Sequence, residues 1–215
     1  TTLAYMREEA KAQKNYEYEC RGHGIFSSVS IECYDRKIHG TESLKDSFAN
    51  SCNTSYANMG LSLDTEAFGK LCREFLFNKT IPTDLITNES IFTLSGESKE
   101  EEVPQTAIGQ GNTQITPILN CMIAATVANN GVMMTPYVVD YIETSEGYVR
   151  EQKEPKKYKR LMSKKEAKVL QELMEAVVTQ GTGSYLNGAS YTVAGKTGSA
   201  EFDENLSQPQ QEIRR

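Results

Sequence analysis

The sequence has little of what a membrane-spanning or nucleic-acid-binding protein needs. Its 215 residues contain no apolar run close to the roughly 18 residues that a membrane span requires. The first segment, TTLAYMREEAKAQKN, turns charged after six residues and does not predict a signal peptide. Acidic residues outnumber basic ones by 29 to 23, giving a formal net charge of −6. This balance argues against a nucleic-acid partner, because neutralising phosphates takes clustered Lys and Arg.

Cysteine is present in an odd number, five, which excludes a fully paired disulfide framework within one chain. Cys20 and Cys33, with His23 and His39, form a C-x2-H…C-x5-H pattern that resembles a set of zinc ligands. The last spacing is too loose for a zinc finger and no apolar mini-core accompanies it, so the sequence predicts no metal site. A cross-strand disulfide and two unpaired thiols are the favoured interpretations of the cysteine pair, and zinc is the least favoured of the three. We also expect no cofactor.

Hydrophobic spacing predicts a chain that is mostly helical, with room for one sizeable core. Asp64 is expected to cap one helix, and Ser163 with Glu166 forms a capping box for another. A third helix begins at Pro117 and is apolar on nearly every side, so we expect it to be central. The helices are expected at 3–14, in two short pieces within 39–60, at 65–77, at 117–129 and at 163–180.

Extended structure is expected in fewer places. A hairpin-like segment spans 16–38, two extended segments with a turn at 145–147 span 132–150, and a short strand at 191–194 leads into Lys196. Residues 79–106 show little periodicity and are expected to form a long surface loop. The run from Lys153 to Lys165 is interrupted by acidic residues and is expected to be a solvated surface.

Residues 192–201, TVAGKTGSAE, could belong to either of two kinds of site. A phosphate-binding loop requires G-x-x-x-x-G-K-[ST] followed by a helix. Here Ser190 stands where the first glycine should be, and the residues after Lys196 do not form an amphipathic pattern. Without the loop and the helix N-terminus that hold phosphates, the sequence argues against nucleotide binding.

The second possibility is serine acyl transfer, whose motif set is S-x-x-K, S-x-N and K-T-G. Lys196-Thr197-Gly198 supplies K-T-G, and Ser51-Cys52-Asn53 supplies S-x-N between two expected helices. The two motifs follow each other in the expected order. On a strand edge, such a Lys and Thr face a cleft, and the glycine leaves room for a substrate backbone. The sequence therefore favours acyl transfer.

Around these motifs the chain resembles the transpeptidase domain of penicillin-binding proteins, most closely the class B kind that crosslinks peptidoglycan. The resemblance is strong in three stretches, HGTESLKDSFANSCNTSYANMG, IGQGNTQITPILNCMIAATVANNGVMMTP and VVTQGTGSYLNGASYTVAGKTGSAE, which cover 39–60, 108–136 and 177–201. It implies an α/β fold in which helices surround a central antiparallel sheet, as in serine β-lactamases. Residues 1–215 are then one partial transpeptidase domain.

One motif of the family is missing. No serine in the sequence has a lysine three residues later. For example, the residue three positions after Ser43 is Asp46, and the residue three positions after Ser163 is Glu166. In the family, the nucleophilic Ser and its Lys lie upstream of S-x-N, on a helix whose second half resembles the uncapped start of this chain. The family also continues its sheet after K-T-G. We therefore expect a segment cut at both ends, without its nucleophile and inactive by itself.

The resemblance implies a role for three catalytic residues. Ser51 would relay a proton toward the leaving amine. Asn53 would hold the family's nucleophile-motif lysine and the substrate amide in register. Lys196 would give positive charge to the substrate carboxylate and share a proton network with Ser51. The alternative interpretations are helix capping for Ser51 and Asn53 and an ordinary surface position for Lys196.

Three further residues are implied in substrate binding. Thr197 would hydrogen-bond the substrate carboxylate, and Gly198 would allow close approach. The backbone N–H of Ser199 would form half of an oxyanion hole. Gln110, Gly111 and Thr116-Pro117, within the second stretch, are instead expected to be scaffold. His39 is expected to be structural, because nothing near it in sequence would make it a base.

The resemblance implies peptidoglycan stem peptides ending in D-Ala-D-Ala and β-lactams as ligands, at the outer face of the bacterial cell membrane. A membrane anchor would then lie outside this segment. Two alternatives share the fold, a serine β-lactamase and a β-lactam sensor, and the T-P-I-L and A-N-N-G helix favours the transpeptidase. An alternative of a different class is a non-catalytic cell-wall-binding domain.

Overall fold

This computed structural model describes residues 1–9 and 11–198. These residues contain eight α-helices and four two-stranded antiparallel sheets. The α-helices are α1 (Thr2–Glu8), α2 (Ala12–Asn15), α3 (Leu44–Ala49), α4 (Asn53–Leu61), α5 (Thr65–Glu74), α6 (Val103–Ala107), α7 (Pro117–Ala128) and α8 (Lys164–Thr179). Three 3₁₀ turns are η1 (Tyr34–Arg36), η2 (Glu100–Glu102) and η3 (Ser184–Leu186).

The strands pair within local ribbons rather than in one broad sheet. They are β1 (Glu17–Cys20), β2 (His23–Phe26), β3 (Val29–Glu32), β4 (Gly40–Ser43), β5 (Val132–Met134), β6 (Tyr141–Glu143), β7 (Val149–Gln152) and β8 (Lys157–Arg160). β1 pairs with β4, β2 with β3, β5 with β8 and β6 with β7. The fold is α/β with antiparallel strands, as predicted, and helices predominate.

The predicted hairpin at 16–38 is correct in its extended segments and wrong in its pairing. β2 and β3 form the tight hairpin, whereas β1 turns away and pairs with β4, which puts Cys20 opposite Gly40. The chain turns between β1 and β2 at Gly22, whose φ is +82°. A side chain there would meet the carbonyl oxygen of Arg36 at 2.3 Å, so only glycine fits this crossing.

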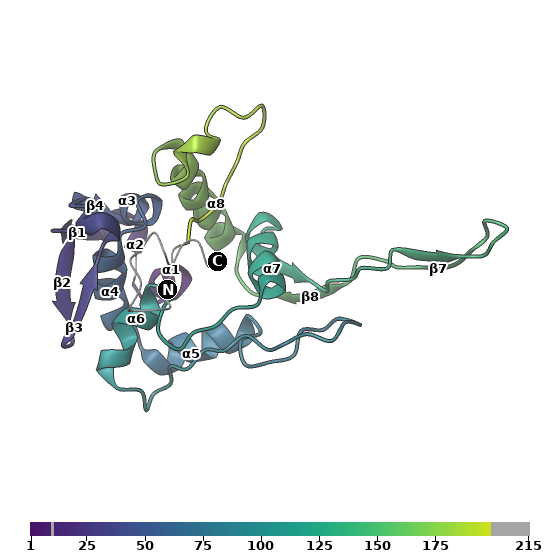
Figure 1. Cartoon of the computed structure of the whole chain (residues 1–215), viewed down its shortest axis with the longest axis horizontal. Coiled ribbons are helices and arrows are strands. Elements are labelled where there is room, and N and C mark those ends of the chain that lie inside the picture. The colour runs from purple at the N-terminus through teal and green to yellow at the C-terminus, as the bar shows by residue number, and fades with distance from the viewer. Residues whose placement is uncertain (10, 199–215) are drawn as a thin grey trace.

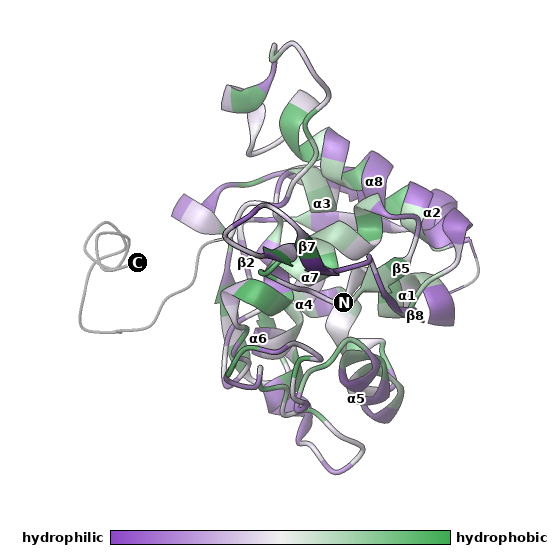
Figure 2. Ribbon diagram, turned by 90° about the vertical axis from the view of Figure 1, so that its right-hand side faces the viewer, coloured by the Kyte–Doolittle hydropathy of each residue, from purple (hydrophilic) through white to green (hydrophobic). Residues whose placement is uncertain are grey.

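Helix starts follow the sequence closely. The Asp64 side chain accepts a 2.8 Å hydrogen bond from the Ala67 N–H and starts α5. Ser163 and Glu166 form the expected capping box of α8, each bonding the other's backbone N–H. In Figure 2, hydrophilic and hydrophobic colours separate onto different sides of α5. These predictions succeed because a cap depends on neighbours within one helical turn.

α1 lies in the middle of the molecule, between the side that carries α3, α4 and α6 and the side that carries α7 (Figure 1). Its Leu3 belongs to the main hydrophobic core, with Phe68 of α5, Leu119 of α7 and Leu173 of α8. An ion pair of 2.7 Å between Arg7 and Glu166 ties α1 to the start of α8. This packing joins both halves of the sequence around one core.

Three sequence expectations need correction. The helix expected at 3–14 is two helices, because Lys11 adopts a left-handed φ of 64° before α2. The segment 79–106 is not only a surface loop: Phe92 and Leu94 are buried in the core, and α6 forms at its end. α7 forms as expected but is not covered on every side, because Cys121 and its neighbours on that face are exposed in the described part of the chain.

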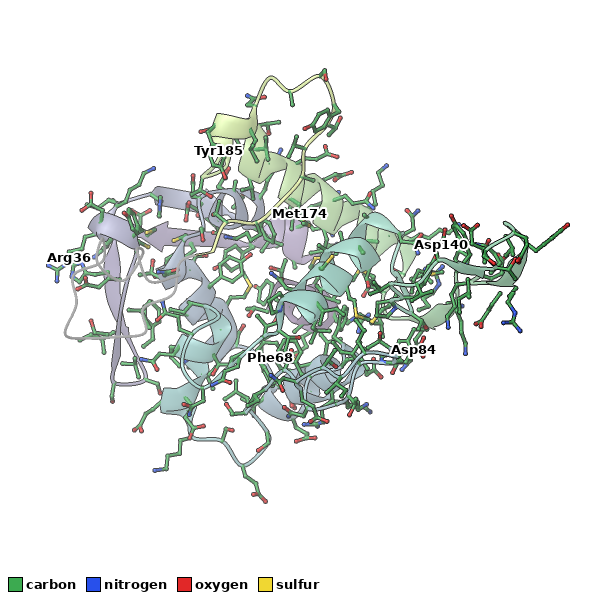
Figure 3. The ribbon with its side chains drawn as sticks, turned by 45° about the vertical axis from the view of Figure 1, so that its right-hand side comes forward. Arg36, Phe68, Asp84, Asp140, Met174 and Tyr185 are labelled. Carbon is green, nitrogen blue, oxygen red and sulfur yellow. The ribbon has the colours of Figure 1, made fainter. Side chains whose placement is uncertain are left out.

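The strands β6 and β7 form an arm that projects from the body (Figure 1). The charged run before α8, expected to be solvated, is exposed along β8, a strand that the sequence analysis missed. The labelled Asp84 and Asp140 lie on the arm's side of the molecule in Figure 3, where Lys153 bonds Asp84 at 3.1 Å. None of the helices that the structure describes has the length and hydrophobicity needed to cross a membrane.

Candidate active site

A cleft of about 1180 Å³ opens where segments from both ends of the sequence meet. The loop between α3 and α4 contributes Ser51, Cys52 and Asn53 to its wall, and the last described residues contribute Lys196, Thr197 and Gly198. Its remaining wall includes the start of α1, part of β3 and the segment after α6. The two motifs that the sequence analysis singled out therefore face one cavity.

Ser51 lies in the tight turn that connects α3 to α4, with a left-handed φ of 54°. This conformation is unfavourable for a residue with a side chain. Its hydroxyl oxygen accepts a 2.7 Å hydrogen bond from the ammonium of Lys196. Ser51 and Lys196, which are implied by the resemblance to share a proton network, thus lie within hydrogen-bond distance of each other.

Lys196 reaches Ser51 from the segment that follows α8. Lys196 retains solvent exposure, but the surrounding protein desolvates its ammonium enough to lower its pKa to about 8. The ammonium also donates to the carbonyl oxygen of Thr197 at 3.0 Å and lies 5.9 Å from the ring centre of Phe48. An ordinary surface lysine has none of these constraints.

Asn53 is the first residue of α4 and lines the same cleft. Its side-chain amide donates a 2.8 Å hydrogen bond to the carbonyl oxygen of Glu32 at the end of β3. The N-cap position belongs to Cys52, and no side chain caps this helix. Helix capping, the alternative role for Ser51 and Asn53, is therefore not the one that the structure gives them.

Thr197 and Gly198 also line the cleft, and the Thr197 hydroxyl is 2.6 Å from the hydroxyl of Thr182. Thr182 is a neighbour that the sequence analysis missed, because nothing in its local pattern marks it. It is held in turn by a 3.0 Å hydrogen bond from its N–H to the carbonyl of Ala49, at the end of α3. Ser199 lies outside the described residues.

The short strand predicted at 191–194 does not form: these residues pair with no strand in the part of the chain that the structure describes. A strand requires a partner to take its backbone hydrogen bonds. In this region Gly195 donates its N–H to the carbonyl of Met174 on α8, at 3.1 Å. The motif is thus held against a helix rather than on the expected inner strand.

The residues expected to be scaffold have local roles. Gly111 takes a left-handed φ of +67°, and the Thr116 hydroxyl caps α7 ahead of Pro117. Gln110 also lines the cleft. Tyr56, a further cleft residue, bonds the Thr2 hydroxyl at 2.8 Å. Burial raises the pKa of its hydroxyl further above physiological pH.

The pattern of possible zinc ligands is only partly reproduced in space. His23 lies at an exposed position of β2 and is not part of the group, whereas His39 contacts Cys20. Cys52, the middle residue of the S-x-N motif, joins Cys33 from the other side. The thiol sulfurs of Cys20 and Cys33 are 3.7 Å apart and are not bonded in this structure.

Comparison with known proteins gives the same family from sequence and from structure. The model of the penicillin-binding protein transpeptidase domain matches residues 2–213. Stage V sporulation protein D of Bacillus subtilis is 29% identical over 93% of this chain, which spans 31% of that protein. Peptidoglycan D,D-transpeptidase PbpA of Mycolicibacterium smegmatis is 32% identical over 94% of this chain, which spans 41% of that protein.

Among solved structures, the imipenem acyl-enzyme complex of penicillin-binding protein A from M. tuberculosis has a TM-score of 0.82 at 26% identity. That match covers 94% of this chain and 47% of the other. The chain thus spans less than half the length of these relatives. Since the family model covers nearly every residue and the fold agrees, the chain belongs to the penicillin-binding protein transpeptidase family.

Proposed function

We propose that residues 1–215 are part of the transpeptidase domain of a peptidoglycan D,D-transpeptidase, which crosslinks stem peptides through a serine acyl-enzyme. The observation that carries this proposal is the 2.7 Å hydrogen bond between Lys196 and Ser51 inside the cleft. It joins the K-T-G and S-x-N motifs of a family whose members include proteins named peptidoglycan D,D-transpeptidase. A β-lactam acyl-enzyme of a structural relative supports the same chemistry.

In the proposed reaction, the oxygen of the Ser-x-x-Lys serine attacks the carbonyl of the penultimate D-Ala, its proton passes to the lysine of that motif, and the D-Ala-D-Ala amide bond breaks. The terminal D-Ala leaves as an amine and needs a proton. Because the Lys196 ammonium donates to the Ser51 oxygen, the hydroxyl proton of Ser51 is free to be donated to that amine. Lys196 can then return a proton to Ser51, and its pKa of about 8 makes this transfer easier than for an ordinary lysine. The amine of a second stem peptide next attacks the acyl-enzyme and gives up a proton, which restores Lys196 through Ser51. The serine leaves and takes its proton back from the lysine of its motif.

Substrate binding would use the same corner of the cleft. The substrate ends in a carboxylate, which the charge of Lys196 and the hydroxyl of Thr197 can receive. Gly198 leaves space beside them, because a side chain built there would meet no atom within 4 Å. Asn53 can turn its amide to the substrate peptide group, and the backbone N–H of Ser199 is assigned to the oxyanion hole by family resemblance alone. β-Lactams would bind as mimics of D-Ala-D-Ala.

The nucleophile is assigned to residues outside this sequence, because no serine in it has a lysine three residues later. Thr1 and Thr2, at the start of α1, line the cleft beside Ser51. A Ser-x-x-Lys shortly before Thr1 would therefore enter the site next to the S-x-N motif. We propose that the protein acts at the outer face of the cytoplasmic membrane, where peptidoglycan is crosslinked, with its membrane anchor in other residues.

Two measurements on the full-length protein test the proposal. Its sequence should contain Ser-x-x-Lys just upstream of Thr1, and a fluorescent penicillin should label that serine as a stable acyl-enzyme. Rapid hydrolysis of the β-lactam without a stable adduct would identify a β-lactamase instead. Absence of both the motif and the label would identify a non-catalytic domain. A stable adduct without crosslinking of stem peptides would favour the β-lactam sensor.

A further inference from the structure

Four side chains with metal-binding atoms, one of them the middle residue of the S-x-N motif, come together from separate parts of the fold. Cys20 ends β1, Cys33 follows β3, His39 precedes β4, and Cys52 lies between α3 and α4. One ligand atom of each lies within 4.8 Å of all the others. No metal site was expected from the sequence, because the pattern considered there paired Cys20 and Cys33 with the two histidines and did not include Cys52.

The distances within this cluster match a tetrahedral metal site. Cys33 Sγ lies 3.7 Å from Cys20 Sγ and 3.7 Å from Cys52 Sγ. Four ligands arranged tetrahedrally about Zn²⁺, with Zn–S bonds of about 2.3 Å, place neighbouring sulfurs about 3.8 Å apart. Cys20 Sγ is 3.3 Å from Nδ1 of His39. A sulfur and a nitrogen bound to the same tetrahedral zinc are expected to lie about 3.6 Å apart, which is close to this distance.

A disulfide explains the cluster less well. A disulfide bond is about 2.05 Å long and joins two sulfurs only. Here Cys33 is equally far from two other cysteines, so a bond to one would leave the third thiol and His39 without a role. Three thiols and one imidazole form a common ligand set for structural zinc.

The residues around the cluster are buried and include a carboxylate without a full set of partners, which favours a bound cation. Cys20 and Cys52 are fully buried, and the side chain of His39 is only 5% exposed. Beside them, the buried carboxylate of Glu42 accepts a hydrogen bond from Asn50, but its Oε2 has no hydrogen-bond partner. The nearest basic nitrogen among the described residues is Nδ1 of His39, 4.0 Å away, which is neutral when it binds a metal. Buried carboxylates are normally paired or close to a metal.

Polar groups around the sulfurs are arranged as donors. The Thr54 hydroxyl, in the first turn of α4, donates to Cys20 Sγ at 3.3 Å and lies within 3.6 Å of the other two sulfurs. The Gly22 N–H points to Cys20 Sγ at 3.4 Å. Donors of this kind stabilise metal-bound thiolates and orient them.

We propose that Cys20, Cys33, Cys52 and His39 bind one Zn²⁺, and that this ion fixes the turn that carries Ser51 and Asn53. Cys52 is the residue between them, so a bond from its sulfur to the metal restrains both neighbours. Ser51 holds an unfavourable left-handed φ of 54°, and no side chain caps α4 at Cys52. The metal would tie this strained turn to β1, β3 and β4. Ser51 would be positioned by the site without contacting the ion.

Metal analysis of the protein purified without chelator tests the site directly. We expect about one zinc per chain, and its loss in Cys20→Ser, Cys52→Ser and His39→Gln. Cys121→Ser and His23→Ala are matched controls outside the cluster and should keep the metal. Zinc well below one equivalent, zinc retained in all three cluster variants, or a disulfide between two of these cysteines in the native protein would overturn the proposal.

Cobalt substitution keeps the test valid if the variants do not fold. The unaltered protein loaded with Co²⁺ should show intense visible absorption from tetrahedral cobalt and a thiolate-to-cobalt charge-transfer band. Weak absorption typical of octahedral cobalt, without that band, would contradict the site. This readout does not depend on any catalytic activity.

The positioning role rests on the proposed function and has its own test. Removing zinc from the full-length protein should slow β-lactam acylation by on the order of tenfold or more, and added Zn²⁺ should restore the rate. Unchanged acylation in the zinc-free protein would refute the positioning role. A zinc-loaded protein that is never acylated would count against the proposed function and would leave the metal site intact.

Discussion

The ammonium of Lys196 donates a 2.7 Å hydrogen bond to the hydroxyl of Ser51, although 145 positions separate the two residues in the chain. The contact depends on how α8 ends. Its carboxyl end turns at Gly181 and packs against the end of α3, where the Thr182 N–H bonds the carbonyl of Ala49. Ala49 is two residues from Ser51, so one helix junction brings the S-x-N and K-T-G motifs together.

Replacing Ser51 should impair acylation without unfolding the protein. In the full-length protein, Ser51→Ala removes the group that we assign to proton relay and should slow β-lactam acylation about 100-fold. Stopped-flow mixing with a chromogenic cephalosporin measures this rate. Ser184→Ala, on an exposed turn outside the cleft, is the control and should acylate normally. If the two variants were acylated at equal rates, Ser51 would have no role in proton transfer.

The pH dependence of acylation should reflect the lowered pKa of Lys196. Its pKa of about 8 means that the side chain is charged below pH 8 and loses its charge above it. Since the charge receives the carboxylate of the β-lactam, acylation should decline above pH 8. Lys196→Arg keeps its charge at alkaline pH and should be slower overall but lack this decline. The same alkaline decline in both proteins would assign it to another group.

Gly181 should tolerate no side chain. A Cβ on this residue would lie 2.1 Å from the carbonyl oxygen of Ala49 and would force α8 away from α3. We expect Gly181→Ala to lower the free energy of unfolding by about 1–3 kcal/mol and to slow acylation by separating Lys196 from Ser51. Urea denaturation and the acylation assay measure the two effects.

Gly96→Ala is the matched control for this substitution. A Cβ on Gly96 would make only ordinary contacts, the nearest at 3.5 Å, with the side chain of Glu66. If Gly181→Ala were as stable as Gly96→Ala and the unaltered protein, the junction between α3 and α8 would have shifted to accommodate the added methyl group, and the prediction would be wrong.

The cap of α8 should contribute measurably to stability. Ser163→Ala removes the side chain that accepts a hydrogen bond from the Glu166 N–H, and should cost about 1 kcal/mol of unfolding free energy. Ser145→Ala, on the exposed turn between β6 and β7, should change stability by less than about 0.5 kcal/mol. Urea denaturation compares them, and an equal effect of both substitutions would argue against the capping box as a source of stability.

Residues 1–215 alone should form no covalent adduct with penicillin. Neither Ser51 nor any other serine of this sequence has a lysine three residues later, and an unassisted serine is a poor nucleophile at neutral pH. Incubation with a fluorescent penicillin followed by a denaturing gel should show no labelled band. A label mapped to a serine within these residues would mean that the nucleophile has been misplaced.

Features that depend on near neighbours could be predicted from the sequence. Asp64 and Ser163 start helices with partners three residues away, and the start of α7 follows from Thr116 and Pro117. The S-x-N and K-T-G motifs were also recognisable, because their chemistry requires those residue types in short, fixed patterns. From these motifs the sequence by itself determined the family and five of the residues that line the cleft, Ser51, Asn53, Lys196, Thr197 and Gly198.

Only the tertiary structure decided which distant segments meet. β1 pairs with β4 rather than with β3, so His39 reaches Cys20 while His23 stays exposed. Cys52 joins the cluster from a turn between two helices, and local spacing could not predict this. The strand expected before Lys196 is absent from the described residues, because strand formation depends on a partner and not on the residues themselves. Local capping is encoded in adjacent residues, whereas pairing and clustering depend on contacts between segments far apart in the chain.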